Sequence, residues 1–90
     1  MDGTDVKINF IAPAILRKWP SLNGQRVTDF GAQPYFIVDG TLDDCIRHFV
    51  SKPASQHHLY EIHTAPQQTL VSAVLSAEQI IELARLREFL

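Results

Sequence analysis

The segment "TLDDCIRHFVSKP", residues 41–53, constrains the fold more than any other part of the chain. Thr41 is a good helix cap, and Asp43 and Asp44 follow it in the first turn, where carboxylates interact favourably with free backbone amides. The apolar residues have the i, i+3, i+4, i+7, i+8 spacing of one helical stripe: Leu42, Cys45, Ile46, Phe49 and Val50. Pro53 ends the pattern. A helix over residues 42–51, packed by one face onto another apolar layer, is therefore predicted.

The C-terminal segment "SAEQIIELARLREFL" predicts a second helix over residues 77–89. Ser76 is its expected cap, and Gln79 stands where a capping box returns a hydrogen bond. Ile80, Leu83, Ala84 and Leu90 share one face, whereas Ile81 and Phe89 point elsewhere. Arg87 falls within the apolar stripe, so we expect it either to carry its charge to water along the helix end or to meet a carboxylate on a partner.

β-Branched and aromatic residues predict strands at residues 25–30, 34–38, 57–64 and 69–75. The last two strands are expected to form a hairpin with its loop at residues 65–68, so that Thr64 faces Thr69 and Ile62 faces Val71. One face of this hairpin is then the core side: Tyr60, Ile62, Val71, Ala73 and Leu75. The opposite face carries His57, Leu59, Glu61, His63, Leu70, Ser72 and Val74.

The first 24 residues give weaker signals. Residues 6–11 alternate like an optional further strand, Pro13 is placed to start a short helix through Trp19, and "PSLNG" is a turn signal. The whole pattern predicts an α+β fold: a two-layer sandwich of a mainly antiparallel sheet of four or five strands with the two helices on one face. We expect one domain over residues 1–90, with residues 1–5 flexible.

Composition excludes several classes of function. Eight basic and ten acidic residues give a net charge of -2, which argues against nucleic acid as a partner, although Arg17 and Lys18 flank Trp19 and could help it stack on a base. The single cysteine, Cys45, allows no internal disulfide and indicates a reducing, cytoplasmic setting. No apolar run approaches the ~20 residues that span a bilayer, so no membrane association is expected.

Three of the four histidines lie within "QHHLYEIHTAP", residues 56–66. If residues 57–64 are extended, a rise of ~3.4 Å per residue keeps His57 roughly 20 Å from His63, too far to share a metal ion. Only Glu61 and His63, two apart on one face, could converge on a ligand, with His48 assisting from the first helix. A helical segment over residues 56–64 is the alternative, and it would instead make His57 and Glu61 neighbours.

These observations rank two functions. The first is a small non-catalytic cytoplasmic domain that binds a protein partner or itself, as a homodimer, with no cofactor; its candidate surface is Leu59, Leu70, Val74, Ile81 and Phe89. The alternative is a metal- or small-ligand-binding or hydrolytic protein, whose candidate residues are Glu61, His63, His57 and His48. An N-terminal segment lying over the sheet would also account for the apolar residues on its outer face.

Overall fold

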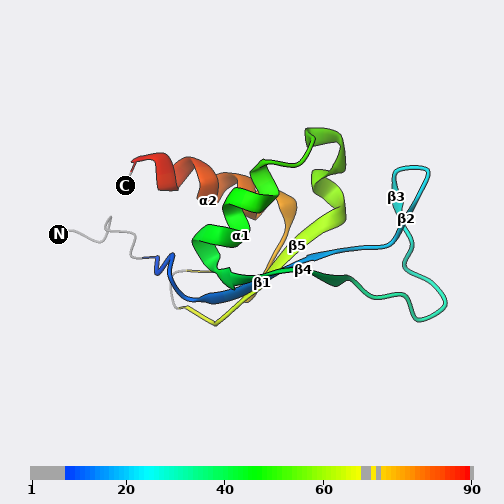
Figure 1. The fold of residues 1–90 in the computed structure, drawn as a ribbon, viewed down its shortest axis with the longest axis horizontal. Coiled ribbons are helices and arrows are strands. Elements are labelled where there is room, and N and C mark those ends of the chain that lie inside the picture. The colour runs from blue at the N-terminus through cyan, green and yellow to red at the C-terminus, as the bar shows by residue number, and fades with distance from the viewer. Residues whose placement is uncertain (1–7, 68–69, 71, 90) are drawn as a thin grey trace.

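The computed structural model describes residues 8–67, 70 and 72–89, and these residues form a helix-covered sheet with a projecting arm (Figure 1). The main sheet has four strands in the order β4-β1-β5-β6, all antiparallel, and β2 and β3 form a separate two-stranded ribbon. The elements are β1 (Pro13–Lys18), β2 (Ser21–Leu22), β3 (Gln25–Arg26), β4 (Tyr35–Thr41), α1 (Leu42–Val50), the 3₁₀ helix η1 (Ala54–Leu59), β5 (Tyr60–Thr64), β6 (Val74–Leu75) and α2 (Ala77–Phe89). The α+β class with both helices on one side of an antiparallel sheet is confirmed.

Helix α1 begins as its sequence predicts. The Thr41 hydroxyl accepts from the Asp44 amide at 3.0 Å, and the Asp44 carboxylate accepts from the Thr41 amide at 3.1 Å, so the capping box is complete. The helix buries Leu42, Cys45, Ile46 and Phe49 against the sheet. Gly40 allows this tight strand-to-helix junction, because a Cβ at this position would lie 2.8 Å from Asp44 Oδ2.

Helix α2 is capped by the predicted pair as well. The Ser76 amide donates to Gln79 Oε1 at 2.9 Å, and the Gln79 amide donates to Ser76 Oγ at 3.4 Å. Ile80 and Leu83 are buried, and Ile81 and Ala84 are half-buried against the same core. Ile80, Leu83 and Ala84 therefore face the core as their spacing predicts. Ile81 was predicted to point elsewhere, and this is wrong because it packs against the same core; Leu90 lies outside the described residues.

The predicted short helix from Pro13 to Trp19 is wrong, because residues 13–18 form β1, which is flanked on both sides within the main sheet. Ala14 and Leu16 are buried toward the helices and alternate with Ile15 and Arg17, which is the period of a strand and not of a helix. Pro13 is tolerated because it occupies the first position of the strand. Residues 8–11 are not a strand, and residues 6–7 of the predicted segment 6–11 lie outside the described residues, as do residues 1–5.

The predicted strand 25–30 is mostly wrong. Only Gln25–Arg26 is extended, and it pairs with Ser21–Leu22 across a two-residue turn in which Asn23 and Gly24 have φ of 54° and 78°. Left-handed angles at both central positions match a type I′ hairpin, which the Asn-Gly pair favours. This hairpin and the loop after it form an arm, residues 20–34, that projects from one end of the main sheet (Figure 1). The turn predicted at "PSLNG" is present, and the predicted strand 34–38 corresponds to the first part of β4, which begins at Tyr35 and runs on to Thr41.

The predicted strand 57–64 is half right. Residues 54–59 wind into η1, so His57 and His58 are not extended, and β5 starts only at Tyr60. Its partner β6 is also shorter than the predicted 69–75, although residues 69 and 71 lie outside the described part. Ile62 pairs with Leu75 instead of Val71, a shift of four residues. An even shift preserves the faces, so Tyr60, Ile62 and Leu75 are buried as predicted.

One core lies between the helices and the inner face of the sheet. Its largest fully buried side chains include Phe49, Leu16, Leu42, Ile46, Ile62, Leu75 and Ile80. The outer face of the sheet carries the alternate residues of each strand, and among the described residues no helix covers it (Figure 1). This open face presents Ile15, Arg17, Phe36, Asp39, Glu61, His63 and Val74.

Candidate functional site

A chain of hydrogen bonds joins three polar side chains on the open sheet face. The Trp19 indole Nε1 donates to Glu61 Oε1 at 2.8 Å, and His63 Nε2 lies 2.5 Å from Glu61 Oε2. Strand β5 places Glu61 and His63 on one face because they are two residues apart, and Trp19 reaches them from the end of neighbouring β1. Glu61 and His63 therefore lie in contact on one face of the sheet, as their spacing of two predicts.

Burial makes Glu61 the centre of this chain. The Glu61 side chain is 12% exposed and the His63 side chain 35%. A carboxylate only accepts hydrogen bonds, so His63 presents a protonated Nε2 to Glu61 and keeps Nδ1 as its remaining polar atom. Both Glu61 oxygens have a partner, so its chemical role is to orient the imidazole and the indole.

The other histidines serve contacts elsewhere. The His57 ring stacks on Phe49 with centroids 4.2 Å apart, and His57 Nε2 bonds the Lys52 carbonyl at 2.9 Å, so it closes the connection between α1 and η1. His58 Nε2 bonds the Gly24 carbonyl at 2.5 Å and faces the arm. His48 is exposed on α1, which packs on the covered face of the sheet, away from Glu61 and His63.

Metal-ligating side chains are dispersed in the same way. Within residues 8–67, 70 and 72–89, no group of three or more His, Cys, Asp or Glu side chains is placed to hold a metal ion. Cys45 is fully buried in the core. Its burial, together with the nearby Asp44 carboxylate, raises the pKa of the thiol to about 11, so Cys45 stays a neutral thiol near pH 7.

The five apolar residues expected to form an interaction surface do not form one patch. Leu59 is buried in the core, so its predicted place on the outer face is wrong; the reason is that η1 replaces the first half of the expected strand. Leu70 and Ile81 are half-buried against the core. Val74 is 45% exposed on the open face, and Phe89 is 87% exposed at the end of α2.

The arm exposes apolar residues that are absent from the predicted interaction surface. Phe30 is 99% exposed and Leu22 is 68% exposed, and Tyr35 and Phe36 follow where the arm returns to β4. The Asn-Gly turn signal within "SLNGQ" could have revealed a hairpin here, and two residues per strand are too few to bury either side chain.

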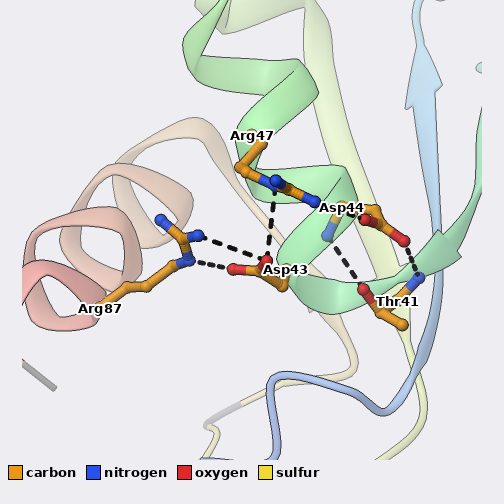
Figure 2. A network of polar contacts seen from close by, with 5 residues as sticks. All are labelled: Thr41, Asp43, Asp44, Arg47 and Arg87. Atoms are coloured by element: carbon orange, nitrogen blue, oxygen red, sulfur yellow. Dashed lines mark hydrogen bonds and ion pairs between the residues drawn. The ribbon is translucent and has the colours of Figure 1, made fainter.

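An ion-pair network fixes α2 on α1 (Figure 2). Asp43 binds Arg87 through both carboxylate oxygens and also contacts Arg47 at 3.4 Å. Arg87 therefore meets a carboxylate within its own chain, and neither the expected free exposure nor a partner is needed to explain it. The Thr41 amide, which donates to the Asp44 carboxylate, holds the pKa of Asp44 below its usual value, and Arg47, which donates to the same carboxylate at 2.9 Å, lowers it further.

A shallow apolar groove of about 330 Å³ lies beside α2. It is lined by Ile8, Leu70, Leu75, Gln79, Glu82, Leu83 and Leu86. The lining offers one carboxylate and one amide as polar groups, which is too little to define a ligand.

No described helix has the length and apolar character required to traverse a lipid bilayer. Comparisons with protein-family models, with curated proteins and with solved structures find no match to this chain.

Proposed function

We propose that this chain is a non-catalytic binding domain that acts through a protein partner or through self-association, and that the arm at residues 20–34 is its main contact element. The observation that carries the proposal is Phe30, whose side chain is 99% exposed although it is aromatic. Burying such a side chain removes ~150–250 Å² from water, worth several kcal/mol at ~25 cal/mol per Å². Leu22 adds to the same surface, since both side chains line one hollow of the arm.

The backbone of Phe30 supports the same conclusion. Its φ is 57°, in the left-handed region, which costs a residue with a Cβ roughly 1–2 kcal/mol. Gly31 follows with a φ of 75°, so the two residues form a tight turn that holds the ring outward. Within the described residues no burial of the Phe30 ring offsets this backbone cost. A partner that covers the ring would offset it.

The base of the arm is held by the body of the domain, so the arm is preorganised. The Trp19 amide donates to the Leu59 carbonyl at 2.7 Å, and Arg26 Nε donates to the His58 carbonyl at 2.7 Å. The Arg26 guanidinium also lies over the Trp19 ring, 5.4 Å from its centroid. An apolar element fixed before binding loses little entropy when a partner covers it.

Photo-crosslinking tests this proposal. A benzophenone side chain placed at position 30 should give one discrete crosslinked product in extracts of the source cell, either with a second protein or with another copy of the chain. The same group at Gln56, exposed on η1, is the matched control. Equal, diffuse labelling from both positions would refute the arm as the contact element.

A second candidate function is ligand binding or hydrolysis at Glu61 and His63, favoured by the hydrogen bond that orients His63. The imidazole ring signals of His63 should then shift on addition of zinc, nickel or manganese, or of a small ester. Glu61→Gln should weaken the response, and His48→Gln should not alter it. Unchanged ring signals at low micromolar free metal and at high ester concentration would end this candidate.

A further inference from the structure

The open sheet face carries two opposite charges with no ionic partner in the described part of the chain. Arg17 on β1 and Asp39 on β4 both point away from the helices, since each alternates with residues of the inner face. Neither forms an ion pair within residues 8–67, 70 and 72–89. Arg17 Nε is buried and finds no acceptor among these residues, and a buried unsatisfied donor costs ~1–3 kcal/mol.

Glu61 does not meet this need, although it is the register partner of Arg17 on β5. Its two carboxylate oxygens are occupied by Trp19 and His63. The ionic partner that would suit Arg17 is therefore a carboxylate from outside the described chain that meets the terminal nitrogens of the guanidinium, since Nε itself is closed to solvent. The partner that would suit Asp39 is a cation from outside it.

The four residues around this pair of charges form a self-complementary pattern. Phe36 is the register partner of Arg17, and Asp39 is the register partner of Ile15, so the charges occupy one diagonal of a quartet and the apolar residues the other. A two-fold axis lying in the interface along the line from Phe36 to Ile15 exchanges the charged corners. It places Arg17 of each copy on Asp39 of the other, and brings each apolar residue onto its own equivalent.

From this geometry we infer that the open sheet face is a two-fold interface with a second copy of this chain. The inference concerns a surface other than the arm and rests on the proposed function only in naming self-association. With strands ~4.8 Å apart and two residues of ~3.4 Å between Ile15 and Arg17 on β1, the diagonal axis makes an angle of roughly 35° with the strands. The strands of the two copies then cross at roughly 70°, close to the orthogonal mode of sheet packing. The 56% exposed Phe36 and the 45% exposed Val74 supply apolar area that such a contact buries.

Charge exchange tests the inference. The wild-type chain should sediment as a dimer at micromolar to millimolar concentration. Arg17→Asp and Asp39→Arg should each be monomeric, since each sets like charges against one another twice. An equimolar mixture of the two variants should form a heterodimer with two restored pairs, and the double variant should be a dimer again. If Arg17 and Asp39 instead paired with each other within one chain, mixing the two variants would restore no pair.

A wild-type monomer, single variants that stay dimeric, or a mixture that stays monomeric would each overturn the inference. A discrete crosslink from position 30 alongside any of these results would leave the proposed function standing, so the two failures are distinguishable.

A second measurement does not depend on the charge variants folding. In Phe36→Cys, a bis-maleimide reagent spanning ~10 Å, the usual separation of packed sheets, should link two copies. Ser51→Cys, exposed on the helix side, should not be linked. The buried Cys45 does not compete for the reagent. Equal linking at both positions would also overturn the inference.

Discussion

Phe49 should be the side chain on which the stability of the fold depends most. Its stacking on His57 gives that histidine a structural role. Phe49 is fully buried, stacks on His57 at 4.2 Å and meets Tyr60 edge-on with centroids 6.3 Å apart. Truncation to alanine would cost ~3–5 kcal/mol. A chain of this length has roughly 5–13 kcal/mol of stability in total, so Phe49→Ala would leave little folded protein to measure.

Phe49→Leu is the more informative change. It keeps most of the apolar volume, at a cost below ~1.5 kcal/mol, but removes two aromatic contacts worth ~0.5–1.5 kcal/mol each. We therefore expect a loss of about 2–3 kcal/mol. Phe89→Leu, at the exposed end of α2, is the matched control and should change stability by less than ~0.5 kcal/mol.

Urea unfolding followed by Trp19 fluorescence measures these values, with an unchanged slope against denaturant showing that two-state unfolding is retained. Combining Phe49→Leu with His57→Ala in a double-mutant cycle should give a coupling free energy of ~0.5–1.5 kcal/mol. A coupling free energy near zero, together with a loss of stability below ~0.3 kcal/mol for His57→Ala alone, would refute the structural role of His57. His57 would then again be a candidate ligand-binding residue.

Three further changes probe the junctions of the fold. Gly40→Ala should cost ~1 kcal/mol because its Cβ displaces Asp44 from the capping box, and adding Asp44→Ala to it should cost little more in urea unfolding. Cys45 favours its neutral thiol in the folded state, so the stability that wild type holds over Cys45→Ala should be complete below the unfolded pKa of 9.0 and lost as pH rises through about 11. Asp43→Asn should speed amide hydrogen exchange over residues 84–89, because Arg87 loses its ionic partner, and this increase should be smaller at high salt. An equal increase in exchange rate over the whole chain would contradict this.

Both helices could be predicted because their signals are local. Each capping box joins residues three apart in the sequence, and each apolar stripe repeats within two or three turns. The sheet needed information from far along the chain. Pro13 resembles a helix start, and only the pairing of β1 with β4 and β5 shows that the segment is extended and that Ala14 and Leu16 face the helices.

The candidate site divides in the same way. The shared face of Glu61 and His63 followed from their spacing of two within β5, which holds whatever the register of β6 is. The four-residue shift of β6 is even, so it changed the pairs across the strands and left Leu75 on the core side. The bond from Trp19 to Glu61 spans 42 positions and could not be predicted from composition. The solvent exposure of Phe30 could not be predicted either, because an aromatic residue usually lies in the core. Only the three-dimensional path of the arm leaves its side chain uncovered.

The projecting ribbon is joined to the domain between two strands that already pair with each other, β1 and β4. Its length can therefore change without altering the register of the sheet or the seating of either helix. Substitutions in this segment would change which partner the molecule binds while its melting temperature stayed nearly constant. Orthologues should therefore differ in length and composition between positions 20 and 34 more than in the strands beneath α1.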